Sequence, residues 1–246
     1  MEPISREGYK FCQDICIPCY QTNSQAFLRP AAFMDLAQEI ACWAAEQLGF
    51  GYHSLHVHHT AWVLSRLHIR FHGPVRWWDR VRLYTWHKGM NGLFFLRDFS
   101  LLDNTGEPCI SATSSWVMID ESTRRLSRPD DESPLQAPAA QMDHALQEPA
   151  PKLLPPAGME AAGEHVVPCS DLDFIGHTNN ARYMVWAMDC LPFAQTERPV
   201  RDAYVNFIKE TKLGDTVQLY RLEEGNAWWV EGRLDGKPCF IVKLEY

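Results

Sequence analysis

The hexapeptide DRVRLY (79–84) returns later in the chain as DTVQLY (215–220), at an offset of 136 residues. Two further segments recur in the same order: IPC (17–19) returns as VPC (167–169), and GEPC (106–109) returns as GKPC (236–239). One short match can arise by chance, whereas three in one order indicate an internal duplication. The offset falls from 150 to 130 residues along the chain, so the second copy has shorter connecting loops.

Each copy predicts a strand, a helix and then several strands. The first helix is expected at about 30–48, because Pro30 suits the first helical position and apolar residues follow with helical spacing. The second helix is shorter, about 180–191, and Pro192 ends it. Polar and apolar residues partly alternate in the expected strands, which lie near 61–71, 79–88, 93–103, 108–119, 202–211, 215–222, 227–234 and 238–245.

These elements predict an α+β protein with two antiparallel sheets, each wrapped around a central helix. The two units can also pair side by side into one continuous sheet, which hides their edge strands. Residues 129–160 are rich in Pro, Ala and acidic residues, a composition typical of an extended linker rather than of packed structure. We therefore expect a first repeat over 1–128, this linker, and a second repeat over 161–246.

Composition excludes several classes of protein. The chain is 46% hydrophobic and 22% charged, and it has no apolar run near the roughly 20 residues that span a bilayer. Its first residues resemble neither a signal nor a transit peptide, which predicts a cytoplasmic protein. Residues 131–246 carry 10 Lys and Arg against 18 Asp and Glu, so nucleic-acid binding is not expected. The eight scattered cysteines are expected to be free thiols.

The segment DLDFIGHTNNARY (171–183) places an acid and an imidazole four positions apart, just before a helix start. Free N–H groups at such a start can hold an oxyanion, so the segment predicts hydrolysis of an activated acyl group. The repeat provides a control, because Asp173, His177, Asn180 and Glu210 fall opposite Asn23, Phe27, Pro30 and Pro74. Positions that build the fold survive in both copies: Ala31/Ala181, Met34/Met184, Ala37/Ala187 and Phe71/Phe207. The chemistry is therefore assigned to the second copy.

Simpler interpretations stand beside this one. Asp173, Thr178 and Asn179 can serve only to cap the helix, with His177 packed at its mouth. A histidine cluster (His53, His56, His58 and His59) and a cysteine run (Cys12, Cys16 and Cys19) have the residue types of metal sites. The histidines are better explained as a loop or flap, and the cysteines as part of a first strand. No metal is expected.

The segment 171–183 resembles the DLDxNxHVNNxxY signature of acyl-acyl-carrier-protein thioesterases, which include plant plastid enzymes and bacterial relatives. The likeness extends over WVLSRLHIRF (62–71), WWDRVRLYTW (77–86), SSWVMIDESTRRL (114–126) and FIKETKLGD (207–215). It implies a double hot-dog fold and the release of fatty acids from acyl carrier protein in fatty acid biosynthesis, without a cofactor. An acyl-CoA thioesterase and a non-catalytic acyl-binding protein are the alternatives.

The resemblance also implies that Asp173 and His177 are catalytic, and it places the family's Glu-Cys pair on Glu210 and Thr211. The family's motif asparagine is Ile175 here, so a nucleophilic scheme lacks both its thiol and its amide. Attack by water remains possible, with Glu210 or Asp173 as the base, aided by His177. The oxyanion would be held by backbone N–H groups around Asn179, Asn180 and Ala181.

Arginines of the first copy form a possible docking surface for acidic acyl carrier protein and its phosphopantetheine. They are Arg66, Arg70, Arg76, Arg80, Arg124 and Arg125. An ordinary solvated face is the alternative. Both a monomer and a homodimer are compatible with a duplicated chain.

Overall fold

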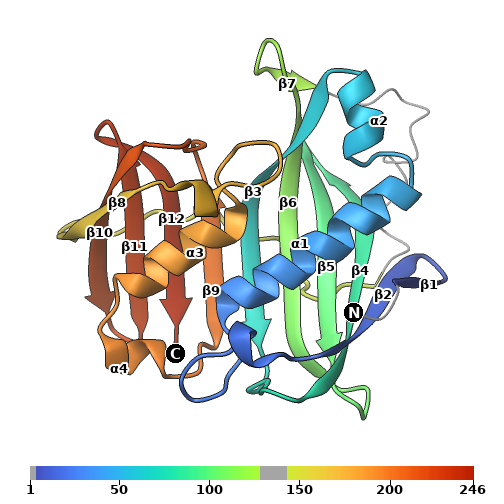
Figure 1. Cartoon of the computed structure of the whole chain (residues 1–246), viewed down its shortest axis with the longest axis horizontal. Coiled ribbons are helices and arrows are strands. Elements are labelled where there is room, and N and C mark those ends of the chain that lie inside the picture. Colours follow the sequence, from blue (N-terminus) through green and yellow to red (C-terminus); the bar gives the residue numbers. More distant parts are fainter. Residues whose placement is uncertain (1–3, 128–142) are drawn as a thin grey trace.

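The computed structural model describes residues 4–127 and 143–246. Its strands form one antiparallel sheet of twelve strands, and the two main helices lie side by side on one face of that sheet (Figure 1). The strand order is β1-β2-β4-β5-β6-β3-β9-β12-β11-β10-β8, with β7 paired to β6. The expected double hot-dog is therefore present, and the sheets of its two units are joined edge to edge.

The bounds of the elements follow the repeat. The first repeat contains β1 (Ser5–Glu7), β2 (Lys10–Cys16), α1 (Pro30–Gln47), α2 (Tyr52–Val57), β3 (Thr60–Phe71), β4 (Arg80–Asn91), β5 (Phe94–Leu102), β6 (Pro108–Asp120) and β7 (Leu126–Ser127). The second contains β8 (Glu160–Val166), α3 (Asn180–Asp189), α4 (Phe193–Thr196), β9 (Asp202–Phe207), β10 (Thr216–Glu224), β11 (Ala227–Leu234) and β12 (Lys237–Glu245). The expected helices and strands are confirmed, except that β9 ends at Phe207 and the expected strand at 202–211 does not reach Glu210, which lies in the following loop. The short elements β1, α2, α4 and β7 were not predicted.

Each main helix buries its apolar face against the sheet of its own repeat. Phe33 and Ile40 of α1 and Met184 of α3 are completely buried in one shared core. Burial of such side chains stabilises the fold by about 1.5–3 kcal/mol each. Arg182 of α3 donates a hydrogen bond to Asp35 of α1 at 3.2 Å and links the two helices. None of the helices in the described ranges is long and apolar enough to cross a membrane.

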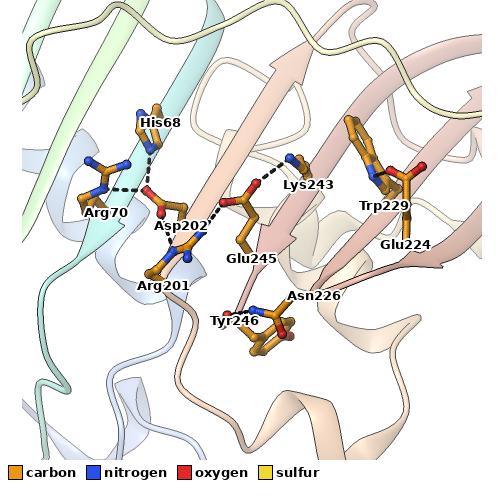
Figure 2. A network of polar contacts seen from close by, with 10 residues as sticks. All are labelled: His68, Arg70, Arg201, Asp202, Glu224, Asn226, Trp229, Lys243, Glu245 and Tyr246. Carbon is orange, nitrogen blue, oxygen red and sulfur yellow. Dashed lines mark hydrogen bonds and ion pairs between the residues drawn. The ribbon is translucent and has the colours of Figure 1, made fainter.

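Strands β3 and β9 join the repeats, and a polar network lies on this joint (Figure 2). The Asp202 carboxylate accepts hydrogen bonds from His68 and Arg70 at 2.8 Å and from Arg201 at 2.9 Å. Burial alone would raise the pKa of Asp202, but these three donors hold it below its ordinary value. Arg201 also binds Glu245, so the network continues from β9 to β12.

The described part of the expected linker is packed, which corrects the expectation of an unpacked segment. Leu146, Ala150 and Leu153 are buried against the outer face of the sheet. Asn206 of β9 holds this segment, because its side chain donates to the Pro151 carbonyl at 3.0 Å and accepts from the Leu153 N–H at 2.8 Å. The apolar residues of this segment thus pack on a face of the sheet, and a side chain of that face forms hydrogen bonds with backbone groups of the segment. Residues 129–142 of the predicted linker lie outside the described residues, and the proposed domain bounds remain a prediction.

Candidate active site

The loop before α3 is built around the side chain of Asp173. Leu172 and Thr178 form an isolated antiparallel bridge, and the Asp173 N–H donates to the His177 carbonyl at 2.8 Å. The Asp173 Oδ1 accepts from the backbone N–H groups of Ile175 and His177, each at 3.1 Å. Gly176 completes the turn with a φ of +82°, a region that favours glycine. Asp173 therefore fixes the loop that presents His177.

His177 and Glu210 lie side by side within the second repeat. Nδ1 of His177 lies 3.8 Å from Oε1 of Glu210, and both side chains are about 70% buried, with 32% and 28% of their surface exposed. This distance is longer than a hydrogen bond, and catalytic contacts of this kind commonly tighten when substrate binds. An imidazole beside a carboxylate can take a proton from water and pass it on. The expected partnership of His177 and Glu210 thus has suitable geometry.

Arg124 of the first repeat forms an ion pair with the other carboxylate oxygen of Glu210. Arg124 lies in the turn after β6 and has a φ of +57°, in the left-handed region where glycine is favoured. An arginine held in this conformation suggests that its side chain is needed at this position. This contact was missed from sequence, because 86 residues separate the two partners.

Thr211, which replaces the family's cysteine, is fully buried. Its hydroxyl lies 2.7 Å from the Thr178 hydroxyl and 3.0 Å from the Tyr183 hydroxyl, and its N–H donates to the Tyr183 oxygen at 3.1 Å. Burial raises the pKa of Tyr183, so this cluster stays uncharged. A hydroxyl enclosed in this way is a structural group, and it offers no nucleophile to a substrate.

The start of α3 supplies fewer free donors than expected. The N–H of Asn179 donates to the Asp171 carbonyl at 2.9 Å, and that of Ala181 donates to the Asn179 side chain at 2.8 Å. Asn179 is thus the N-cap residue that the simpler interpretation predicted. The N–H of Asn180 has no partner among the residues that the structure describes, so it is the one candidate here for holding an oxyanion.

The apolar side of the site comes from the first repeat. The rings of Phe174 and Tyr52, which begins α2, meet edge to face with centroids 5.1 Å apart. Behind α2 lies a separate apolar cluster that contains Phe50, Phe95 and Met118. The loop of the second repeat therefore opens beside an apolar region under the helices of the first repeat. The histidines near 53–59 lie on the short helix α2 and the turn that follows it, so part of the expected loop is helical, and the flap role stays a prediction.

The structure does not bring the six candidate docking arginines together. Arg124 lies in the turn that follows Asp120, the register partner of Thr60 at the start of β3, whereas Arg70 lies ten residues further along, near the other end of β3. Arg70 is bound to Asp202. Arg66 stacks over the ring of Phe94, and Arg76 stacks over the ring of Phe27. Arg80 is exposed on β4. Of the six, only Arg125 lies in the same turn as Arg124. A docking surface near the site is thus limited to this turn.

Within residues 4–127 and 143–246, no three His, Cys, Asp or Glu side chains are grouped so that they could hold a metal ion. The groups that the structure gathers at the site are the Glu210 carboxylate, the His177 imidazole, the Arg124 guanidinium and the Asn180 N–H.

Comparison with known families gives two matches. The family model of the acyl-ACP thioesterase N-terminal domain matches residues 8–134. The family model of the acyl-ACP thioesterase C-terminal domain matches residues 159–232. The chain is 28% identical over 208 residues to oleoyl-acyl carrier protein thioesterase 1, chloroplastic, of Arabidopsis thaliana, covering 77% of this chain and 57% of that protein. It is 30% identical over 209 residues to the palmitoyl-acyl carrier protein thioesterase, chloroplastic, of the same plant, covering 79% and 50%. The chain thus spans about half the length of these relatives.

Solved structures share the whole fold. The 12:0-ACP thioesterase from Umbellularia californica superposes with a TM-score of 0.86 at 22% identity, covering 98% of each chain. An acyl-ACP thioesterase from Bacteroides thetaiotaomicron gives a TM-score of 0.81 at 22% identity, covering 96% of this chain and 97% of the other. These likenesses confirm the double hot-dog architecture.

Proposed function

Because this chain belongs to the acyl-ACP thioesterase family, we propose that it hydrolyses fatty acyl-acyl carrier protein to a free fatty acid and the carrier thiol. The observation that carries the proposal is the approach of His177 to Glu210 beside the start of α3. This pair unites a base and a proton carrier at a helix start that has a free N–H. Together these three elements can activate water, move its proton and stabilise the oxyanion during thioester hydrolysis.

In the proposed mechanism, Glu210 is the base and Asp173 holds the loop. Oε1 of Glu210 is directed toward His177, whereas Oδ1 of Asp173 is already occupied by two backbone N–H groups. Glu210 takes a proton from water while the water oxygen forms a bond to the thioester carbon. The carbonyl oxygen becomes an oxyanion, which accepts a hydrogen bond from the Asn180 N–H. When the C–S bond breaks, the proton passes through His177 to the leaving thiolate.

The acyl chain is proposed to lie in the first repeat. Phe174 of the site loop contacts Tyr52, and α2 in turn covers the apolar cluster of Phe50, Phe95 and Met118. An alkyl chain that enters beside Phe174 can displace these side chains from one another and bury its methylene groups, with about 0.8 kcal/mol gained for each. The repeat that lacks catalytic groups would thus select the substrate.

The carrier protein is proposed to dock at the turn that contains Arg124 and Arg125. Arg125 is exposed, and it follows directly after the arginine that contacts Glu210. A phosphate or an acidic surface suits a guanidinium at this position. The turn would orient the thioester toward the site, and this role agrees with its place at the boundary between the two repeats.

The test measures thiol release from acyl-ACP and from acyl-CoA over a series of chain lengths. The proposal predicts turnover of acyl-ACP with a higher kcat/KM than acyl-CoA of the same chain length. His177→Ala and Glu210→Gln should each abolish this turnover. Turnover of acyl-CoA alone would show that the protein is an acyl-CoA thioesterase instead. Acyl binding without thiol release would contradict the proposal that the protein is an enzyme.

A further inference from the structure

The loop that carries His177 has a structural counterpart at the start of α1. Thr22 and Leu28 form the same isolated bridge as Leu172 and Thr178, and Oδ1 of Asn23 accepts from the N–H groups of Gln25 and Phe27 at 3.0 and 2.9 Å. The Leu28 N–H donates to the Val75 carbonyl at 2.8 Å, as the Thr178 N–H donates to the Thr211 carbonyl at 3.2 Å. The loop before α1 is thus placed and held in the same way as the loop before α3.

The partner elements of the two loops correspond as well. Phe174, in the loop before α3, contacts α2, the short helix that follows α1. In the same way Asn23 and Ser24, in the loop before α1, bind the short helix that follows α3, which is α4, and the residue after it. The Asn23 side chain donates to the Thr196 carbonyl at 3.3 Å, and the Ser24 hydroxyl donates to Glu197 at 2.5 Å. In Figure 1, α4 and the loop that leads into α1 lie in the lower part of the view, whereas α2 lies at the upper right. The fold therefore contains two related sites at opposite ends.

A cavity of about 700 Å³ lies at this second site. Its volume is within the range of small-molecule sites. The walls come from both repeats and are largely apolar, and they include Phe27, Phe71, Val75, Val185, Leu191 and Val200. Such a cavity has space for a long apolar chain.

None of the described residues that line this cavity is equivalent to a catalytic residue and also keeps its chemical group. Its four equivalent positions carry Asn23, Phe27, Pro30 and Pro74 in place of Asp173, His177, Asn180 and Glu210. Pro30 has no N–H, so the start of α1 also lacks the donor that Asn180 provides. A ligand at this site can be bound but not hydrolysed by the same chemistry.

The charged groups around the cavity favour an anion. Arg29 and Arg198 are exposed at its rim, and neither forms an ion pair within the described ranges. Arg201 is bound by two carboxylates of the joint. Burial lowers the pKa of His72, which favours the neutral imidazole, and burial raises the pKa of Asp189 against the opposing effects of His165 and Arg29. Among the described residues, no carboxylate lies within ion-pair distance of either arginine, although Arg29 attracts the Asp189 carboxylate at longer range. Guanidinium groups match a carboxylate in geometry, so both arginines can still bind one.

We infer that this cavity is a second, non-catalytic binding site for a free fatty acid, whose carboxylate lies at Arg29 and Arg198 and whose chain enters the apolar walls. Only the identity of the ligand rests on the proposed function, because a free fatty acid is the product of that reaction. The site is the counterpart of the catalytic one, with binding retained and chemistry lost.

The test uses the full chain and hexadecanoic acid that carries a diazirine near its methyl end. After irradiation, mass spectrometry should find adducts in segments 71–75 or 185–201, and excess unlabelled hexadecanoate should suppress them. The double variant Arg29→Glu/Arg198→Glu should reduce these adducts at least tenfold. Arg80→Glu, at an exposed position on β4 outside the cavity, is the matched control and should leave them unchanged.

Two further arms separate recognition from nonspecific contact. The corresponding diazirine alcohol should label the cavity at least tenfold less than the acid, and Val185→Phe should reduce labelling by narrowing the apolar wall without a change in charge. Equal labelling by acid and alcohol, or unchanged labelling of the double variant, would overturn the inference. Because His177→Ala should keep these adducts, loss of hydrolysis and loss of this site are distinguishable outcomes.

Discussion

Asn23 and Asp173 occupy equivalent positions in the two repeats, and the side-chain oxygen of each accepts hydrogen bonds from two backbone N–H groups of its own loop. An amide and a carboxylate thus hold the same loop in one chain. The negative charge of Asp173 is therefore not required for the loop geometry. This relationship allows the structural and electrostatic roles of Asp173 to be separated.

We expect Asp173→Asn to retain the loop and to lose less activity than Asp173→Ala. Asparagine keeps the acceptor, as Asn23 shows, whereas alanine leaves two N–H groups unpaired, at a cost of about 1–3 kcal/mol for each one that is buried. The measurement is kcat for thiol release, together with urea unfolding of both variants. If Asp173→Asn abolishes turnover as completely as Glu210→Gln, then Asp173 is the base and the proposed mechanism is wrong.

Arg124→Gly should lower kcat without destabilising the protein. Arg124 has a φ of +57°, so glycine relieves about 1–2 kcal/mol of backbone strain while it removes the ion pair with Glu210. Without this partner the Glu210 carboxylate is less well oriented, and we expect kcat to fall about tenfold or more with acyl-ACP and with small thioesters.

Arg125→Ala is the matched control for Arg124→Gly, because Arg125 is exposed in the same turn and has no ion pair within the described part of the chain. We expect it to raise KM for acyl-ACP and to leave small thioesters unaffected. Equal losses in both variants with both substrates would show that the turn acts through the fold rather than through Glu210.

Sequence pattern located the helices and strands because burial against one sheet imposes a period on each element. The helix expected at 30–48 and the strand expected at 227–234 match α1 and β11 to within a residue. The helix α2 was missed, since only Leu55 of its six residues is buried and no apolar period results. The packing of Leu153 was also missed, because its partner Asn206 belongs to a distant strand and the segment itself has no periodic pattern.

The candidate site was predictable in part, because the duplication distinguishes residues that build the fold from residues that do not. Phe27 and Pro74 replace His177 and Glu210 in the first copy, and the structure places His177 beside Glu210. Asp173 is replaced by Asn23, which holds its loop in the same way, so the repeat alone did not reveal that Asp173 builds the loop. The contact of Arg124 depends on the β3–β9 joint, which no local pattern encodes. Long-range pairing of strands decides such contacts, so they require the folded chain.

Lys88→Met should destabilise the protein strongly. Nζ of Lys88 lies 2.9 Å from Asp98 Oδ2, both side chains are buried, and Lys88 also donates to the Leu146 carbonyl at 3.2 Å. Removal of the cation leaves an unpaired buried carboxylate, for which we expect a loss of about 3–5 kcal/mol in urea unfolding. Lys88→Met/Asp98→Asn should recover more than half of this loss, because the amide removes the charge and still accepts from the Ala145 N–H. A double variant as unstable as the single one would refute this explanation.

The stability of the joint should fall as the pH decreases below about 6.5. Burial is the main reason that the pKa of His68 lies below its ordinary value, and the same holds for His72, so the unfolded chain binds protons more readily than the folded one. Their contribution to stability is therefore complete above about pH 6.5, and it decreases as the pH falls, by up to about 1.4 kcal/mol per pH unit for each histidine.

Urea unfolding of the wild type between pH 7.5 and pH 5 measures this slope, and His68→Gln should flatten it. Glutamine cannot be protonated in this range, and it retains an N–H donor for Asp202, the partner of His68 at 2.8 Å. Asp202 has a lowered pKa, so its own contribution is lost only below about pH 3.9 and does not enter this window. His58→Gln, in an exposed turn, should leave the slope unchanged. If His68→Gln has the same slope as the wild type, the acid sensitivity arises outside the β3–β9 joint.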